Sequence, residues 1–255
     1  MRLVLCASAL ALALAGCGGE SGPAGPALEE TAANLEEIES GVLHMSVRMD
    51  PKDGDEFGYE IEGPIRLAEE DAVPQADVQY RQFANSEDET VRLVLTDGGG
   101  WVVRDGRRID LSETQLAELR ESGSLLGQEG LGTLSFQQWV SDAELSGGPD
   151  GTDKVTGELD VAAAMAGLAA LSGVLPENLV LSAEQRKQVA ESVEDSSFEL
   201  LTGEDDRLLR KLALDFTLGA DVPEDLREAI GEDAVGATFS FELGLDAVNE
   251  AVSIG

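Results

Sequence analysis

The sequence predicts an α+β fold built on one large antiparallel sheet. Three observations carry this prediction. About ten segments alternate apolar and polar residues with a period of two, the helical patterns gather mainly in the middle of the chain, and strands and helices do not alternate one by one. A regular βαβ alternation would indicate a parallel sheet instead. An antiparallel sheet commonly buries one face and leaves the other in water, so we expect helices to cover the apolar face.

The start of the chain has the pattern of a lipoprotein signal peptide. Residues 3–15 are almost all small and apolar, a length typical of a signal-peptide core and too short to span a bilayer of about 30 Å. The stretch LAGC at 14–17 matches the bacterial lipobox, which predicts a signal peptide over 1–16 and lipidation of Cys17. The alternative is an ordinary secretory signal in which this cysteine is incidental. The other cysteine lies in the removed segment, so no further thiol remains.

The remainder of the chain is expected to form a tether and one domain. Residues 17–27 begin with the acylated cysteine and are rich in Gly, Pro and Ser, which predicts a flexible tether. A helix with one apolar and one acidic face is expected over 27–40, ended by Gly41. No later linker divides the chain, so residues 28–255 are expected to fold as a single domain.

The first strands follow directly. In residues 42–49 the side chains of Leu43, Met45, Val47 and Met49 share one face, and residues 57–67 repeat the pattern, which predicts an antiparallel hairpin. Pro64 suggests a sheet edge or a bulge. Further strands are expected near the ranges 77–83, 89–96, 100–104 and 107–110, the last two joined by an Asp-Gly turn.

Helices are expected in the second half, between strands. Ser112 and Ser182 are suitable N-caps for helices over 113–122 and 182–193. Residues 133–144 are interpreted as helical, after a glycine-rich loop. The remaining strands are expected at 153–160, in a hairpin over 196–220, and at 236–246.

Composition limits the possible partners. The net charge is −34, from 51 acidic and 17 basic residues. Nucleic acid and a bare anionic membrane surface both require clustered Lys and Arg, so neither is an expected partner. Aromatic residues make up 4% of the chain, which disfavours a sugar-stacking cleft, although a pair of glycosidase carboxylates stays open.

No catalytic or metal-binding pattern is apparent. His44 is the single histidine and is expected on the polar face of a strand. The chain has no G-x-S-x-G nucleophile elbow, and one histidine without a mature cysteine cannot form a His/Cys zinc site. The acidic loops 50–55 and 203–206 lack EF-hand spacing, so calcium is a minor alternative to plain turns. The sequence predicts no enzyme, no metal and no cofactor.

The helix expected over 161–173 is unusual because it is apolar all round yet built mostly from Ala, Gly and Leu. Such a helix should be buried. It could leave space against the sheet and form a cavity wall, or it could be a close-packed core helix whose small residues allow backbones to approach. The sequence leaves these two alternatives even, since native cores rarely keep large voids.

The whole arrangement resembles the LppX/LprG-type lipoproteins of actinobacteria and, more distantly, the LolA/LolB lipoprotein carriers. The resemblance covers nearly all of the mature chain. The segments that carry it are LAGC at 14–17, the helix and strand over 28–49, and the stretches 95–112, 137–144, 153–168 and 200–216.

The resemblance implies a deeply curved sheet, a half β-barrel, with helices on its concave apolar face. It implies a hydrophobic cavity for acylated lipids or glycolipids, fatty acyl chains such as palmitate on Cys17, and a place at the extracytoplasmic face of the cell membrane. A carrier of lipids across the envelope is the expected function. The alternative is an envelope sensor or protein-interaction lipoprotein; no residue identifies a headgroup or a protein partner. The candidate cavity residues are Val161, Met165, Gly167, Leu168, Leu171, Phe136 and Trp139.

Overall fold

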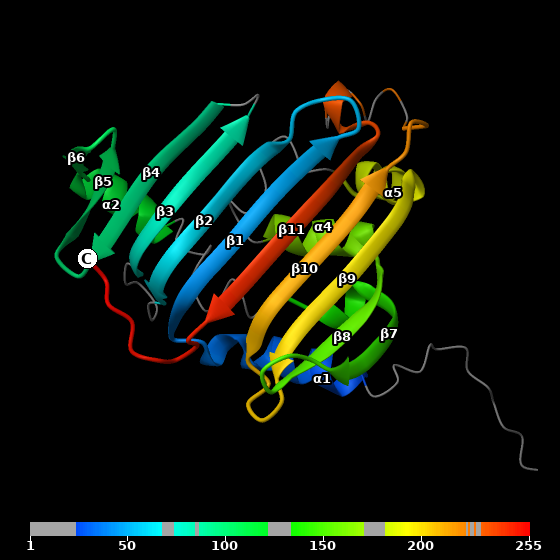
Figure 1. Cartoon of the computed structure of the whole chain (residues 1–255), viewed down its shortest axis with the longest axis horizontal. Helices are drawn as coiled ribbons and strands as arrows, with labels where there is room; N and C mark the ends of the chain where they lie inside the picture. The colour runs from blue at the N-terminus through cyan, green and yellow to red at the C-terminus, as the bar shows by residue number, and fades with distance from the viewer. Residues whose placement is uncertain are drawn as a thin grey trace, which may run out of the picture.

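A single curved sheet dominates the computed structural model (Figure 1), which describes residues 24–67, 74–84, 87–121, 134–170, 182–222, 224, 227 and 231–255. Its eleven strands are all antiparallel to their neighbours. They are β1 (Ser40–Pro51), β2 (Phe57–Arg66), β3 (Gln75–Ala84), β4 (Glu87–Thr96), β5 (Gly99–Arg104), β6 (Arg107–Asp110), β7 (Val140–Gly147), β8 (Thr152–Leu159), β9 (Val193–Gly203), β10 (Leu209–Leu218) and β11 (Ala237–Asp246).

The strand order is β6-β5-β4-β3-β2-β1-β11-β10-β9-β8-β7. The chain therefore runs outward from β1 to one edge, crosses to the opposite edge at β7, and returns strand by strand to β11 beside β1. The two edge strands do not pair with each other, so the sheet is curved but unclosed. The predicted α+β class with a large antiparallel sheet is confirmed.

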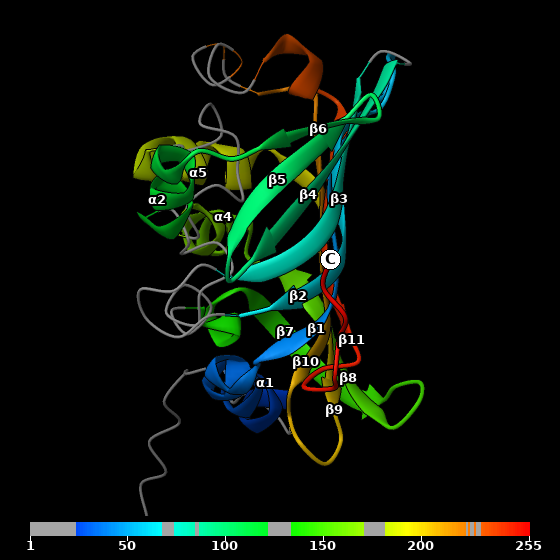
Figure 2. The same cartoon turned by 90° about the vertical axis from the view of Figure 1, so that its left-hand side faces the viewer.

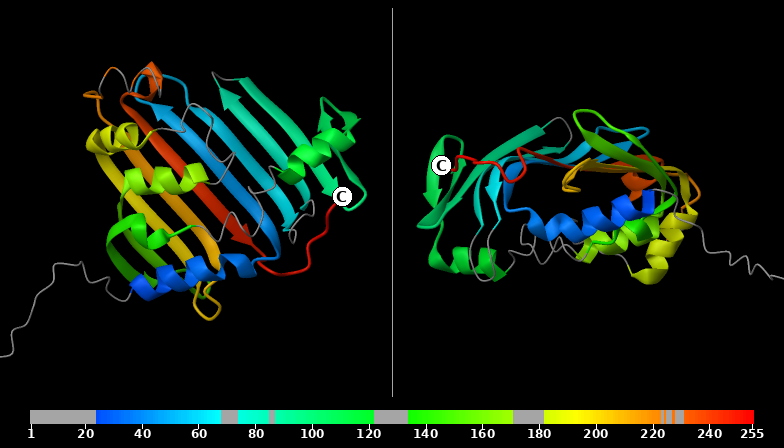
Figure 3. Two further views of the ribbon diagram at one scale, coloured as in Figure 1. Left: turned by 180° about the vertical axis from the view of Figure 1, so that it is seen from behind. Right: turned by 90° about the horizontal axis from the view of Figure 1, so that it is seen from below.

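The four α-helices whose bounds the structure describes lie on one side of this sheet (Figure 2). They are α1 (Ala24–Ala33), α2 (Glu113–Glu121), α4 (Val161–Ala170) and α5 (Ala183–Glu191). Viewed from below, the sheet arches over them, so they occupy its concave face (Figure 3). Short 3₁₀ turns, Asn34–Glu37, Phe136–Gln138 and Glu232–Ala234, complete the described elements.

Local sequence explains where these helices begin. Ser182 accepts a hydrogen bond from the backbone N–H of Gln185 (3.3 Å), and the Gln185 side chain accepts one from the Ser182 N–H (3.0 Å), which is a capping box. Ser112 makes the same pair of bonds with Gln115. The carboxylate of Asp160 accepts from the N–H of Ala163 (3.0 Å) at the start of α4. Both predicted serine caps are confirmed.

The concave side also holds the buried core. Leu28 on α1, Phe136 and the β9 residues Phe198 and Leu200 are almost fully buried there. Thr31 of α1 donates a hydrogen bond to the hydroxyl of Thr202 on β9 (2.8 Å), and both are buried. The start of the chain body is thereby fixed to the sheet.

Four sequence-based expectations need correction. Helix α1 begins at Ala24, so residues 24–27 belong to the folded body and not to the tether. Pro64 lies in an interior strand; the ladder between β2 and β3 skips Gly63 and Pro64 and resumes in the same register, so the site is neither an edge nor a bulge. This gap accommodates a residue that has no N–H to donate.

The other two corrections concern helices. Of the segment 133–144, the described residues 134–144 do not form an α-helix: a 3₁₀ turn at Phe136–Gln138 leads into β7, which pairs with β8. The hydrogen bonds to β8 make this segment a strand, and local helix or strand propensity does not include such bonds. Helix α4 is not buried all round, because Ala166 is exposed.

Candidate functional site

An apolar pocket lies between α4 and the sheet. Every described lining residue except Ser240 is apolar, and none of these described residues has a titratable side chain. The lining residues are Val47, Leu159, Val161, Ala164, Met165, Leu168, Val189, Leu214, Phe216, Leu218, Phe239, Ser240 and Phe241. They come from β1, β8, β10, β11, α4 and α5, segments that are far apart in the chain.

The sheet side of the pocket follows from strand register. Leu214 is directly opposite Phe241, which is directly opposite Val47 on the next strand, so these side chains share one face. Phe216 and Phe239 are also paired, and their rings stack with centroids 4.9 Å apart. Period-two alternation therefore places a continuous aromatic and aliphatic wall on the concave face.

The helix side of the pocket uses small residues and one flexible one. Val161, Ala164 and Leu168 are 3%, 2% and 6% exposed and recur at helical spacing. Met165 is half-buried beside them. Three of the predicted cavity residues, Val161, Met165 and Leu168, thus line the pocket.

The other predicted residues do not line it. Phe136 and Trp139 are buried and form an edge-to-face aromatic pair, with ring centroids 5.5 Å apart. A Cβ placed on Gly167 would collide with the Trp139 indole, so this glycine permits close packing and does not widen a cavity. Leu171 and Cys17 lie outside the described residues.

The sequence reasoning missed the sheet wall. Leu214, Phe216, Phe239 and Phe241 were recognised as strand residues but not as pocket residues. The signal was present, because apolar residues alternate along both segments and 237–246 is the one described strand with two phenylalanines. Only their pairing shows that they face α4.

The pocket is small as it stands. Its volume is about 60 Å³ counted as room for the centre of a water-sized sphere, and about 650 Å³ of atom-free space when its open mouth is included. A cavity holds a water molecule from roughly 10–15 Å³ upward, and apolar cavities stay dry. The arrangement can therefore take an apolar group and offers it no reactive side chain.

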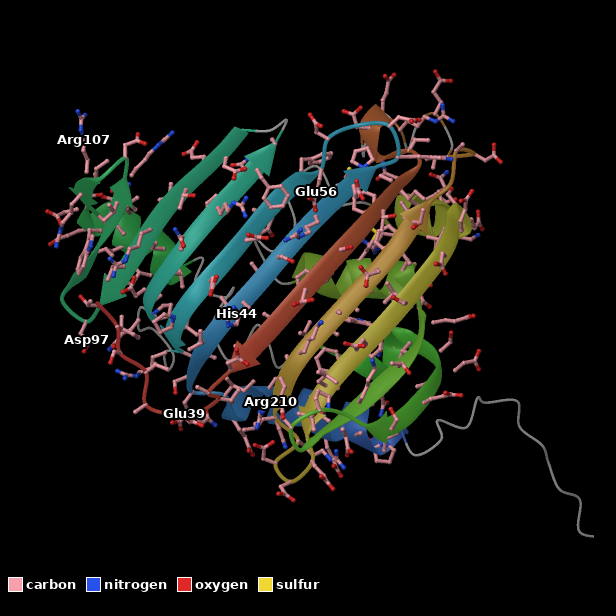
Figure 4. The ribbon with its side chains drawn as sticks, viewed as in Figure 1. Glu39, His44, Glu56, Asp97, Arg107 and Arg210 are labelled. Carbon is pink, nitrogen blue, oxygen red and sulfur yellow. The ribbon has the colours of Figure 1, made fainter. Side chains whose placement is uncertain are left out.

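The opposite, convex face is charged. His44 lies on this face (Figure 4). Its Nε2 is 3.2 Å from the Asp246 carboxylate, and its Nδ1 is 3.7 Å from the Glu62 carboxylate. In the described part of the chain, the ion-pair partners of His44 are these two carboxylates. Within the described ranges there is no group of three or more His, Cys, Asp or Glu arranged to hold a metal. None of the described helices is long and apolar enough to cross a membrane.

Comparisons with known proteins agree with the resemblance stated from the sequence. No protein-family model and no curated protein matches the chain. Among solved structures, LprF from Mycobacterium bovis is similar with a TM-score of 0.47 and 12% identity, over 91% of this chain and 95% of LprF. A LolA superfamily protein from Nitrosomonas europaea is similar with a TM-score of 0.24 and 12% identity, over 89% of this chain and 93% of that protein.

The predicted resemblance to LppX/LprG-type lipoproteins is thus confirmed as a structural similarity to LprF. At these identities and TM-scores the similarity carries no argument about function. The functional conclusion depends on the pocket.

Proposed function

We propose that this protein is an envelope lipoprotein that binds an acyl chain of a lipid or glycolipid between α4 and strands β10, β11 and β1. In this proposal Cys17 carries the lipid anchor, the body stands at the extracytoplasmic face of the cell membrane, and the bound lipid is carried across the envelope. The observation that supports it is the pocket lining, which is apolar at twelve of thirteen residues.

The chemistry required is burial alone. Each methylene removed from water contributes about 0.8 kcal/mol, so ten buried methylenes would contribute about 8 kcal/mol before the cost of ordering the ligand. A carrier needs no reactive group. The described lining residues, none of which is titratable, match this requirement.

The small volume favours a second candidate, an envelope lipoprotein that does not carry lipid. Ligand pockets usually enclose about 300–1,000 Å³, and the present pocket reaches that range only with its open mouth included. Lipid binding therefore requires α4 to move away from the sheet, whereas the second candidate requires no movement.

The test is native mass spectrometry of the full-length protein, extracted from its own membranes with a styrene–maleic acid polymer so that no detergent competes. Ala164 lines the pocket, whereas Ala166 is exposed on the other side of α4. Ala164→Leu and Ala166→Leu therefore make the same substitution inside and outside the pocket. We expect lipid on the wild type and on Ala166→Leu, and less on Ala164→Leu.

The melting temperature separates the two candidates. A carrier has room for the added side chain, so Ala164→Leu should keep its melting temperature while losing lipid. A close-packed core should instead lose about 1–3 kcal/mol of stability, with no lipid on any variant. That second result would replace the carrier with the non-carrier function.

The anchor is tested separately. Cys17→Ala should remove acylation, so the variant should leave the detergent phase in a phase-partition experiment. Cys6→Ala is the matched control, because this residue lies in the removed segment and its loss should change nothing. Equal partitioning of the wild type and Cys17→Ala would reject the lipoprotein assignment.

A further inference from the structure

The sheet is unclosed, and its two edge strands differ in how well they are protected. β6 and β7 are the outermost strands, and no described strand pairs with either of them from outside (Figure 1). An exposed edge carries unpaired main-chain N–H and C=O groups that can pair with another chain, so natural proteins block it with bulges, charges or short strands. Whether an edge accepts a further strand therefore depends on its geometry and its charges.

The β7 edge is blocked by both geometry and charge. Its ladder with β8 shifts register between Ser141 and Glu144, and Asp142 has a positive φ of 49° there. Such a bulge bends a strand away from flat pairing. The charged residues of β7 are Asp142 and Glu144, both acidic, so two copies of this strand would also repel each other.

The β6 edge lacks a bulge and carries charges of both signs. Its residues read Arg-Arg-Ile-Asp, all are exposed, and they pair with β5 in one continuous register. Arg108 and Asp110 share the convex face, where their side chains form an ion pair (2.8 Å). Ile109 lies on the concave face and, at 58% exposed, is the one large exposed hydrophobic residue in the described part of the chain. This edge can therefore make both polar and apolar contacts.

The free main-chain groups of β6 belong to Arg108 and Asp110. The N–H of Leu111 donates to the carbonyl of Gly100 on β5 (2.9 Å). Residues that bond to the neighbouring strand alternate with residues that do not along an antiparallel ladder. Every second residue back from Leu111 therefore faces β5, and the residues between them, Arg108 and Asp110, direct their N–H and C=O groups outward.

Charge selects one register for pairing β6 with the β6 strand of a second copy. Antiparallel pairing that matches the outward groups can centre on Arg108, Ile109 or Asp110. Centring on Arg108 or on Asp110 places that residue directly opposite its own copy, and like charges in this position destabilise a sheet. Centring on Ile109 places each Arg108 opposite Asp110 of the other copy on the convex face. It also brings the two Ile109 side chains together on the concave face.

We propose that β6 pairs antiparallel with β6 of a second copy of this chain, centred on Ile109. The contact is two-fold symmetric and self-complementary, as in most homodimers, and combines main-chain hydrogen bonds with two ion pairs and one apolar contact. A four-residue strand buries less than the roughly 1,200 Å² of a stable interface, so the pairing is weak in dilute solution. Copies held in one membrane by the proposed anchor have a higher effective concentration. The pairing uses no pocket residue and does not depend on lipid binding.

The test is disulfide trapping of the full-length protein in its own membranes, with copper phenanthroline as the oxidant and a non-reducing gel as the readout. Ile109→Cys places two thiols opposite each other in a non-hydrogen-bonded pair, where the Cα atoms are about 4.5 Å apart. Disulfides form at Cα separations of about 4.4–6.8 Å. We therefore expect a cross-linked dimer from Ile109→Cys.

Arg107→Cys is the matched control, because residue 107 is exposed on the same strand and the same face. In the proposed register the two copies of residue 107 are four positions out of alignment, or about 14 Å apart, which is too far for a disulfide. Arg107→Cys should give only the background of the wild type.

Two further changes, both made in the Ile109→Cys protein, test the register. Arg108→Asp turns two attractive cross-strand pairs into two repulsive ones and should lower the dimer yield about tenfold. Adding Asp110→Arg exchanges the signs of the two positions and should restore the yield. Both residues are exposed, so neither change removes a buried contact.

Each contrary outcome overturns the proposal and leaves the pocket untouched. Equal cross-linking of Ile109→Cys and Arg107→Cys would show random collision. No cross-linking of Ile109→Cys, or a cross-link to a different protein, would show that β6 does not meet its own copy. A yield that Asp110→Arg does not restore would reject the register.

Discussion

The two faces of strands β9–β11 are chemically opposite although their residues alternate along the same chain. On the concave face, Leu214 and Phe241 are buried against α4. On the convex face, the ammonium of Lys211 lies between Glu199 and Glu242, 3.0 Å from the latter. The comparison shows that one step along a strand exchanges an apolar wall for an ion-pair network. A register slip would therefore invert the chemistry of both faces at once.

The strongest test of this comparison exchanges the two side-chain types. Leu214→Asp places an unpaired carboxylate in the apolar wall, and we expect a loss of about 3 kcal/mol or more in the free energy of unfolding. Asp215→Leu makes the converse change one residue later on the convex face and should cost less than about 1 kcal/mol. Urea denaturation measures both. Similar losses for the two variants would contradict the assignment of the faces.

A second test concerns the close packing between Gly167 of α4 and the ring of Trp139. Gly→Ala in a helix normally gains up to about 1 kcal/mol. Gly167→Ala should instead lose about 1–3 kcal/mol, because the added Cβ collides with the Trp139 ring. In a double-mutant cycle with Trp139→Leu, the cost of Gly167→Ala should shrink or reverse. An unchanged cost in the Trp139→Leu background would show that the ring is not its cause.

The smallest expected effect belongs to the convex face and depends on pH. Arg92 donates a hydrogen bond from Nε to Asp77 (2.6 Å) and lowers the pKa of that carboxyl. A lowered pKa in the folded state means that this contribution is complete above the unfolded value of about 4 and is lost as pH falls through the folded value. Asp77→Asn should therefore reduce the loss of stability between pH 7 and pH 3, by less than about 1 kcal/mol.

Arg92→Gln is the companion variant in this measurement. It removes the same interaction from the other side and should flatten the same part of the pH profile. None of the pocket-lining residues that the structure describes is titratable, so variants there should leave the acid-dependent part unchanged. A pH profile that Asp77→Asn does not alter would remove this ion pair from the account of acid stability.

Local sequence was sufficient to predict those features that depend only on contacts between residues close together in the chain. Period-two alternation predicted the strands and their buried faces, because side chains alternate across any strand. Ser112 and Ser182 predicted helix starts, because a cap is satisfied within three residues. The β9–β10 hairpin and the Asp-Gly turn between β5 and β6 follow from equally local rules.

Tertiary structure decided the rest, because the deciding contacts join distant parts of the chain. Residues 140–147 form a strand only because β8 pairs with them, and Pro64 is tolerated in an interior strand only because the β3 ladder skips it. The direction that α4 faces is set by Trp139, which occupies the Gly167 side. The pocket wall joins Val47 to Phe241, nearly two hundred residues away. Sequence alone determined which strand residues share a face, whereas sheet order determined which of those faces meet.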